Sequence, residues 1–433
     1  MSLSTQKSEN QTARRDTFGN EIDPVVGFAR GSIIKSSIEE AKRLRHGQNV
    51  AAKRVQALGP RSIGVFTGNQ RDFPVRPEDL YTNCEEWIGP GLYAEELRTV
   101  AIEHLGGRSD EGCAVFNRTS AGIVATIAAL AGGKPVLSVV PAGDRSHASV
   151  VRGCALAGVG LKEVTSDKDW RIHIAECHLV IVTTVTSALA RLDDALTVAV
   201  VEEAHKTGAI VLLDEAYGAR LRPVLHGGQK ALALGADLAI TNCDKAGLSG
   251  PRAGVLVGRS GLVMAAAAKA AEYGMEARAP IAAAVLRSLQ KFDPHHLTQE
   301  AAAGQELATA LESAMGAGVV MRSDLGPMVD ENAVLAIILE RASVSANAVS
   351  VVPCEATAAL GMLLLADHGI LTVNTHGQPG ARVSLRLKPT LDALASVGGV
   401  SAIIDAVDDC IAKVAAIVTD ESAMKTLILG DFA

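Results

Sequence analysis

Between about residue 91 and residue 260, short apolar runs alternate with alanine-rich stretches of helical composition. The apolar runs lie at residues 114–116, 135–140, 179–183, 209–213, 238–241 and 253–257. Apolar strands separated by helices are typical of a parallel sheet that is covered by helices on both faces. The chain is therefore predicted to contain an α/β domain that binds its ligands at the carboxyl ends of the strands.

The pattern changes on both sides of this region. Residues 1–60 are predicted to form an N-terminal helical arm, because Ile33, Ile34, Ile38 and Leu44 recur at helical spacing. Residues 61–270 form the predicted large domain. Residues 271–433 begin with a long alanine-rich helix at 279–315 and continue with mixed elements at 334–340, 370–373 and 382–387. We expect them to form a linking helix and a smaller C-terminal α/β domain.

Composition narrows the class of protein further. The 433 residues include 41 Lys+Arg and 48 Asp+Glu, which give a formal net charge of −7, and 48% of the residues are hydrophobic. These values argue against a disordered chain and against a globally basic nucleic-acid binder. No run reaches the ~18 apolar residues of a membrane span, so we expect no membrane association. The polar segment 1–16 does not resemble a secretory signal.

The seven cysteines, at positions 84, 113, 154, 177, 243, 354 and 410, form no CxxC pair and no Cys/His ligand spacing. An odd number of scattered cysteines is typical of reduced thiols in a cytoplasmic protein and predicts no zinc site.

Two strand ends carry small polar residues at the start of a helix. Thr119, Ser120 and Ala121 follow the run 114–116, so they could offer free backbone N–H groups and hydroxyls to an anion. An ordinary Ser/Thr cap of a helix is the alternative. His147 follows the run 135–140 and could lie flat against an aromatic ring, although a lone histidine is more often a surface or core residue.

Two further strand ends carry charged residues. Asp214 ends an apolar strand, where a carboxylate is costly to bury without a cation or a strong donor. Lys245 lies among small residues after the next apolar strand, a setting in which the pKa of a lysine can fall and its amine can act as nucleophile or base. One strand-helix unit separates them, which predicts neighbouring strand ends. A lysine for the aldehyde and an aspartate for the ring nitrogen form the pair that pyridoxal 5'-phosphate requires.

The order of anchor helix, His147, Asp214 and Lys245 resembles that of a fold-type I pyridoxal-phosphate-dependent enzyme over about residues 60–400. The loop 243–254, Cys-Asp-Lys-Ala-Gly-Leu-Ser-Gly-Pro-Arg-Ala-Gly, resembles the loop signature of bacterial selenocysteine synthase, the L-seryl-tRNA selenium transferase. Residues 117–121 are similar to the matching helix start in archaeal selenocysteine-synthase-like proteins. The resemblance implies a large domain with a mostly parallel seven-stranded sheet, a smaller C-terminal α/β domain and an N-terminal helical arm.

This resemblance also implies a role for each candidate residue. Lys245 would be the Schiff-base lysine and the proton shuttle, and Asp214 would keep the ring nitrogen of pyridoxal phosphate protonated. His147 would stack on the ring, and Ala216 would offer a small surface to its other face. The cofactor phosphate would be held by Thr119, Ser120 and Ala121, with help from Thr241.

Arginines are the candidates for holding the substrate. The segment 380–386 resembles the strand that brings a substrate-carboxylate arginine to such sites, with Arg382 as first choice and Arg386 as second. An arginine fork binds a carboxylate through two charge-assisted hydrogen bonds. Arg252, in a Gly-Pro turn, would bind an anionic substituent of the substrate or a phosphate from a neighbouring subunit. A purely structural role is the alternative for each of these arginines. Tyr217 and Arg220 could line the entrance.

The resemblance favours a lyase that performs α,β-elimination or β-replacement on an amino acid with a β-hydroxyl or similar substituent. The alternatives are selenium transfer on seryl-tRNA, which the net charge disfavours, an aminotransferase or racemase reaction, and an interaction protein that keeps the fold without catalysis. A dehydrogenase is excluded because no GxGxxG motif follows the early strands. The resemblance also implies a homodimer or a multiple of dimers, with the arm lying on the partner.

Overall fold

The computed structural model describes residues 14–71, 76–81, 85, 87–376 and 383–432. The chain divides into two compact units. The larger unit contains Gly68–Gln305 and Ser323–Gly326, and the smaller unit contains the residues up to Thr67, Glu306–Arg322 and the residues from Pro327 onward.

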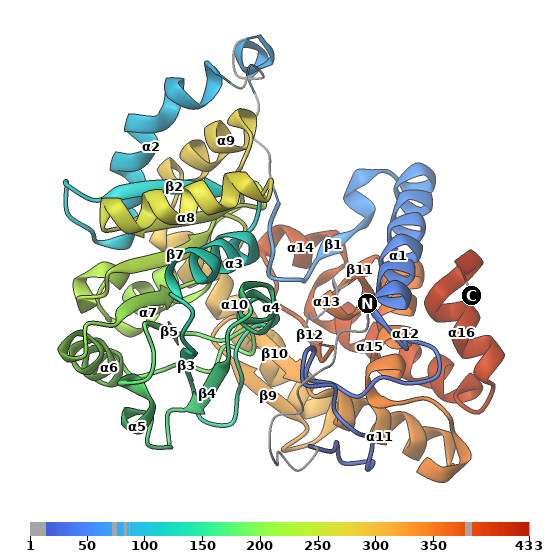
Figure 1. Cartoon of the computed structure of the whole chain (residues 1–433). Helices are drawn as coiled ribbons and strands as arrows, with labels where there is room; N and C mark the ends of the chain where they lie inside the picture. Colours follow the sequence, from blue (N-terminus) through green and yellow to red (C-terminus); the bar gives the residue numbers. More distant parts are fainter. Residues whose placement is uncertain (1–13, 72–75, 82–84, 86, 377–382, 433) are drawn as a thin grey trace. The chain divides into compact units, whose positions relative to one another are not determined.

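The centre of the larger unit is a seven-stranded sheet in the order β2-β8-β7-β6-β5-β3-β4 (Figure 1). Its strands are β2 (Gly112–Phe116), β3 (Val136–Val140), β4 (Leu161–Thr165), β5 (Leu179–Thr183), β6 (Ile210–Asp214), β7 (Leu238–Asn242) and β8 (Gly254–Gly258). β8 runs antiparallel to both of its neighbours, and the other strand pairs are parallel. The predicted fold class, a mainly parallel α/β sheet, is confirmed.

Helices pack on both faces of this sheet because side chains of its buried strands alternate between two apolar cores. Val180, Val182 and Val211 belong to the core that includes side chains of α2 (Gly89–Leu105), α6 (Asp194–Lys206) and α9 (Ala279–Gln290). Leu179 and Ile181 belong to the other core, with α3 (Thr119–Leu130), α4 (Ala148–Ala157) and α8 (Ser260–Glu272). The unit also contains α5 (Arg171–Ile174) and α7 (Gly218–His226).

In the smaller unit, helices from both ends of the chain surround a separate apolar core. These are α1 (Ser37–Leu58), α11 (Glu331–Ala342), α12 (Pro353–His368), α13 (Val373–His376), α14 (Leu391–Ser396), α15 (Gly399–Ile417) and α16 (Glu421–Leu429). β1 (Gly64–Val65) pairs in parallel with β11 (Ile370–Leu371). A three-stranded sheet has the order β12-β10-β9, from β12 (Leu385–Arg386), β10 (Gly326–Val329) and β9 (Val320–Ser323). α10 (Pro294–Met315) belongs to both units.

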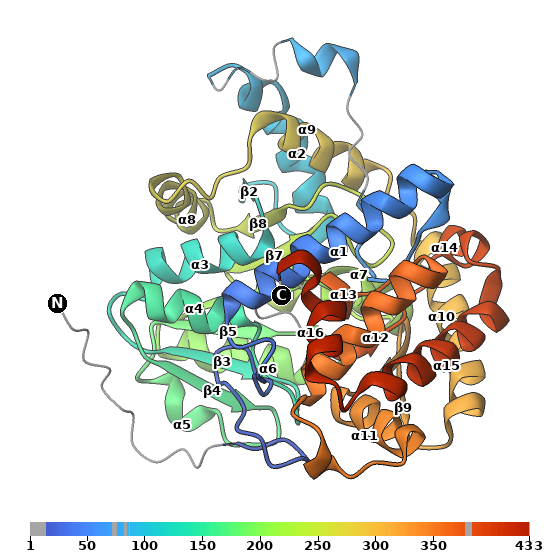
Figure 2. The same ribbon diagram turned by 90° about the vertical axis from the view of Figure 1, so that its right-hand side faces the viewer.

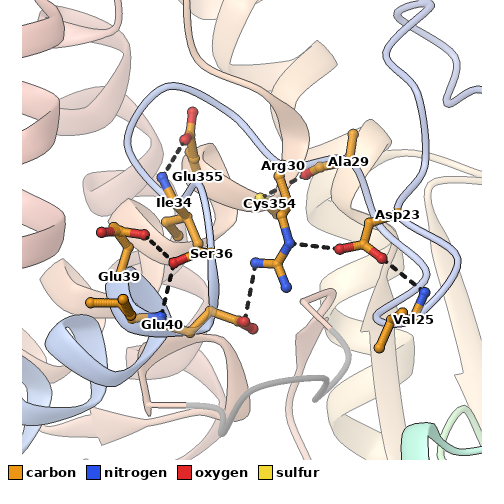
Figure 3. A network of polar contacts seen from close by, with 11 residues as sticks. Asp23, Val25, Ala29, Arg30, Ile34, Ser36, Glu39, Glu40, Cys354 and Glu355 are labelled. Carbon is orange, nitrogen blue, oxygen red and sulfur yellow. Dashed lines mark hydrogen bonds and ion pairs between the residues drawn. The ribbon is translucent and has the colours of Figure 1, made fainter. Parts of the chain in front are cut away.

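Residues 14–67 are part of the smaller unit and do not form a separate arm. α1 packs against α12, α13 and α16 of the same chain (Figure 2). Ahead of α1, the Glu355 carboxylate accepts hydrogen bonds from the backbone N–H groups of Ile33 and Ile34, each at 2.7 Å. Figure 3 shows the bond from Ile34. Arg30 pairs with Asp23 at 2.7 Å and with Glu40 at 3.1 Å. The Glu355 contacts tie the segment to the first turn of α12, and the Arg30–Glu40 pair ties it to α1.

Other predicted boundaries also differ from the observed ones. Residues 271–305 belong to the larger unit rather than to a C-terminal domain. The predicted helix 279–315 is two helices, because Pro294 lacks a backbone N–H and begins α10. Residues 334–340, predicted among mixed elements, lie within α11. Across the described part of the chain, every helix is too short or too polar to cross a membrane.

Candidate active site

Four of the predicted site segments leave the same edge of the large sheet. Thr119 follows β2, His147 follows β3, Asp214 ends β6 and Lys245 follows β7. These four strands run in the same direction, so their carboxyl ends meet at one edge. Lys245 lies close enough to Asp214 and His147 for their charges to shift one another's pKa values. The structure therefore brings together the residues that the sequence placed at separate strand ends.

Asp214 is a buried carboxylate that lacks a strong partner. Only 4% of its surface is exposed, and its Oδ1 accepts one hydrogen bond, from the Ala216 N–H at 3.3 Å. Within the described ranges, no Lys, Arg or His forms an ion pair with it. Burial raises the pKa of Asp214 to about 6, although the Ala216 N–H and the Lys245 charge act in the opposite direction. A cationic N–H donor would satisfy this carboxylate, and the protonated ring nitrogen of pyridoxal phosphate is such a donor.

Lys245 lies on a sharply turned loop. Ala246 has φ 49° and Gly247 has φ 78°, so the chain adopts left-handed conformations directly after the lysine. The Lys245 Nζ lies 4.8 Å from the centroid of the Tyr217 ring. Burial lowers the pKa of Lys245, and the charges of Arg252 and Arg220 act in the same direction, while Asp244 and Asp214 oppose the shift. A larger fraction of the amine is therefore neutral and able to act as nucleophile or base.

Arg220 supports the lysine loop from inside the protein. Its fully buried guanidinium donates hydrogen bonds to the Ala246 carbonyl (3.1 Å), the Ala216 carbonyl (3.1 Å), Asn242 Oδ1 (2.9 Å) and Thr241 Oγ1 (3.0 Å). The prediction that Arg220 lines the entrance is therefore wrong. The sequence signal was an arginine six residues after a strand-end aspartate, but most of its hydrogen-bond partners are backbone and side-chain atoms of residues 241–246, far away in the sequence.

Thr241 was predicted to help hold the cofactor phosphate, but its surroundings do not fit that role. The side chain is fully buried, and its hydroxyl donates a hydrogen bond to the Glu215 carbonyl at 2.9 Å while it accepts one from Arg220. A hydroxyl has one hydrogen, and that hydrogen is used. Thr241 therefore stabilises the ends of β6 and β7 rather than offering a donor to a phosphate.

The start of α3 offers two unpaired backbone donors among the described residues, the N–H groups of Thr119 and Ser120, whereas the Ala121 N–H donates to the Arg118 carbonyl at 3.1 Å. Thr119, Ser120 and Ala121 are partly exposed, and the N-cap residue Arg118 forms no side-chain cap. The N–H groups of a first helical turn lack partners within the helix and favour an anion. Thr119 Oγ1 bonds the Ala253 carbonyl at 3.4 Å, which places this helix start against the segment that leads from Lys245 into β8.

Gly254 allows this close approach. A Cβ atom at Gly254 would lie 2.7 Å from the Thr119 Cα and 2.8 Å from the Arg118 carbonyl oxygen. We expect Gly254→Ala to displace the start of α3, to lower the free energy of unfolding by about 1–3 kcal/mol and to weaken the binding of pyridoxal phosphate. Urea unfolding and a cofactor titration measure the two effects. Gly261→Ala, with nothing within 4 Å of its Cβ, is the matched control. Equal behaviour of the two variants would contradict the expectation.

His147 is the N-cap of α4. Its Nδ1 accepts a hydrogen bond from the Ser149 N–H at 3.2 Å and lies 2.8 Å from the Ser149 hydroxyl. The residue is exposed, although nearby protein atoms desolvate its imidazole. This desolvation, together with the charges of Lys245 and Arg118, lowers the pKa of His147 to about 3. The imidazole is therefore neutral near pH 7 and suited to lie against a ring.

The other candidates lie in different surroundings. Ala216 is partly exposed beside Asp214. Arg252 is partly buried within electrostatic range of Lys245. Arg386 belongs to β12 of the smaller unit, where its Nε donates to Ser384 Oγ at 2.9 Å, and 4% of its surface is exposed. Arg382 lies outside the described residues.

The fold is shared with solved structures of low sequence identity. A probable N-succinyldiaminopimelate aminotransferase from Thermus thermophilus has a TM-score of 0.53 at 14% identity, covering 83% of this chain and all of that one. An alanine–glyoxylate aminotransferase from Nostoc sp. has a TM-score of 0.53 at 14% identity, covering 80% and 94%. These likenesses show the fold-type I architecture of pyridoxal-phosphate enzymes.

Sequence relatives identify the family. No family model matches the chain. A UPF0425 pyridoxal phosphate-dependent protein from Methanothermobacter thermautotrophicus is 34% identical over 402 residues, which cover 92% of this chain and 100% of that protein. A relative with the same description from Methanosphaera stadtmanae is 28% identical, covering 86% and 95%. The predicted cofactor is the one for which these relatives are named. The chain belongs to the UPF0425 family of pyridoxal phosphate-dependent proteins.

Proposed function

We propose that the chain is an enzyme that binds pyridoxal 5'-phosphate at the carboxyl edge of its seven-stranded sheet. The observation that carries this proposal is the pairing of Asp214, a buried carboxylate without an ion-pair partner among the described residues, with Lys245, an amine of lowered pKa. The two residues serve opposite ends of the same heterocycle. The uncapped start of α3 offers donors for the phosphate.

Each residue has a proposed task. Lys245 would hold the cofactor through its Nζ and, once the substrate amine has displaced it, its neutral amine would take the proton from Cα of the substrate. Asp214 accepts the hydrogen bond of the ring N–H and keeps the proton on that nitrogen. His147, neutral near pH 7, would lie against the ring, and Thr119, Ser120 and Ala121 would hold the phosphate. When bound, pyridoxal phosphate supplies a conjugated ring that accepts the electron pair left at Cα.

Within this class we propose a lyase that removes or replaces a β-substituent of an amino acid. The support is the similarity of loop 243–254 to the selenocysteine synthase signature and a lysine suited to abstract the Cα proton. Loss of the Cα proton and of the β-substituent, followed by addition of water, releases ammonia and a 2-keto acid. We rank selenium transfer on seryl-tRNA lower because of the net charge of −7.

A product assay tests this reaction class. Holoenzyme is incubated with O-acetyl-L-serine or with L-alanine, which lacks a β-leaving group, and ammonia and 2-keto acid are measured in the absence of any added keto acid. We expect both products from O-acetyl-L-serine, repeated over many turnovers, and none from L-alanine. Keto acid formed only once per active site, without ammonia, would indicate transamination and contradict the proposal.

A further inference from the structure

Thr183 carries a buried hydroxyl that no described protein group bonds. The residue ends β5, only 3% of its surface is exposed, and within the described ranges its Oγ1 has no hydrogen-bond partner. By contrast, the hydroxyls of the fully buried Thr126 and Thr375 donate to backbone carbonyls at 2.8 and 2.9 Å. A buried polar atom without a partner lowers stability, so its presence in a native protein calls for an explanation.

The sheet register places Thr183 beside Asp214. The two residues are direct partners in the parallel pair β5–β6. Two residues earlier in each strand, Ile181 and Leu212 both belong to the apolar core that includes side chains of α3 and α4. Because side chains alternate between the two faces along a strand, Thr183 and Asp214 lie on this same face of the sheet. The threonine therefore borders the proposed cofactor site.

The two side chains have complementary hydrogen-bonding capacity. A carboxylate can accept several hydrogen bonds, but among the described residues Asp214 accepts one, from the Ala216 N–H at 3.3 Å. The Thr183 hydroxyl has one hydrogen to donate. Rotation of the threonine side chain between its staggered positions turns the hydroxyl toward the neighbouring strand without any movement of the backbone.

A second donor to Asp214 is useful when the cofactor is bound. Burial raises the pKa of Asp214 to about 6, whereas the carboxylate must stay ionised to keep a proton on the ring nitrogen. A hydrogen bond donated to the ionised carboxylate stabilises that form. It also fixes the plane of the carboxylate, so that its remaining acceptor positions stay directed at the ring N–H.

We infer that Thr183 is a positioning residue for pyridoxal phosphate: when the cofactor is bound, its hydroxyl donates a hydrogen bond to the Asp214 carboxylate and holds that carboxylate ionised toward the ring N–H. This inference rests on the proposed function and adds a residue to the same site. Thr183 acts through Asp214 and requires no contact of its own with the substrate.

Cofactor titrations and urea unfolding test the inference on the wild type, Thr183→Val, Thr183→Ser and the control Thr375→Val. Valine keeps the shape of threonine and removes the hydroxyl, whereas serine keeps the hydroxyl. Thr375 is also fully buried, but its hydroxyl donates to the Gly361 carbonyl at 2.9 Å within the smaller unit. Each protein is unfolded in its cofactor-free form and is titrated with pyridoxal phosphate.

We expect Thr183→Val to bind pyridoxal phosphate about tenfold more weakly than the wild type, while the urea midpoint of its cofactor-free form stays at or above the wild-type value. Thr183→Ser should bind about as tightly as the wild type. Thr375→Val should unfold at a lower urea concentration with unchanged cofactor affinity. Wild-type affinity in Thr183→Val would overturn the inference, and so would a lowered urea midpoint of this variant, because the hydroxyl would then have a structural role.

Coupling to Asp214 provides a second measurement. In an Asp214→Ala background the acceptor is absent, so adding Thr183→Val should weaken cofactor binding no further. An equal loss of affinity in both backgrounds would contradict an action through Asp214. The cofactor absorbance of the wild type is recorded first: its absence contradicts the proposed function, whereas its presence together with wild-type affinity in Thr183→Val contradicts only this inference.

Discussion

Replacing Asp214 with asparagine is expected to slow turnover by about a hundredfold to a thousandfold while it makes the cofactor-free protein more stable. Turnover falls because asparagine cannot hold a proton on the ring nitrogen of the cofactor. Stability rises because the native state no longer has to bury a carboxylate that lacks an ion pair among the described residues. A residue with a purely structural role would lower both quantities together.

The stability gained by Asp214→Asn depends on pH, because the pKa of Asp214 is raised in the native protein. In the unfolded chain the Asp214 carboxyl has its ordinary pKa of 3.8, and in the native protein its pKa is about 6. Below pH 4 both states are protonated and the substitution has no electrostatic effect. As the pH rises through 4–6 the native carboxyl becomes costly to ionise, so above pH 6 the variant gains up to about 3 kcal/mol. Urea unfolding of cofactor-free protein across this range measures the gain.

Asp237→Asn is the matched control, and we expect it to change the stability in the opposite direction. It is also buried, but it pairs with Arg259 at 2.9 Å and accepts the Val211 N–H at 2.9 Å, and hydrogen bonds of this kind hold its pKa below the ordinary value despite burial. Asp237→Asn is therefore expected to destabilise the protein above pH 4, by about 1–3 kcal/mol. If Asp214→Asn destabilises the protein in the same way, Asp214 is a structural carboxylate.

Replacing Lys245 with alanine is expected to reduce turnover by about a thousandfold or more and to remove the absorbance band that arises from a cofactor bonded to a lysine. The variant loses the nucleophile for the aldehyde and the base for the Cα proton. Folding should persist, because the buried amine has a lowered pKa and its loss removes a desolvated cation. Circular dichroism checks the fold, and Lys206→Ala, at an exposed lysine paired with Glu203, controls for the loss of a lysine.

Partial rescue separates chemistry from structure in this variant. A small amine such as methylamine can occupy the space left by the side chain and act as the missing base, so added methylamine should restore part of the activity of Lys245→Ala in proportion to its concentration. Activity that stays near the wild-type level in the unrescued variant would show that another residue acts as base.

Short apolar runs in the sequence correctly predicted most strands of the large sheet. The apolar runs located six strands of the large sheet, but β4 was missed because this edge strand carries Lys162 and Glu163. An edge strand is bonded on one side and is partly exposed, so it need not be apolar. The long helix 279–315 was wrong because its alanine content outweighed the signal of Pro294 in the prediction.

Some residues of the candidate site could be predicted from nearby sequence, and others could not. Asp214 and Lys245 were predicted from charge at the end of an apolar strand, a signal that lies within a few residues. The true surroundings of Arg220 and Thr241 could not be predicted, because they bond to atoms from β6, β7 and the lysine loop that meet only in the folded protein. The packing of α1 on α12 and α16 likewise joins the two ends of the chain.

Borohydride reduction followed by peptide mapping tests the central claim most directly. Hydride converts the bond between a lysine Nζ and the cofactor aldehyde carbon into a stable secondary amine, so the modified residue can be located by mass spectrometry. We predict a pyridoxyl phosphate group on the peptide that contains Lys245 and on no other lysine peptide, and its absence from Lys245→Ala. A wild-type protein that is unmodified after saturation with pyridoxal phosphate, or that is modified at a different lysine, would contradict the account.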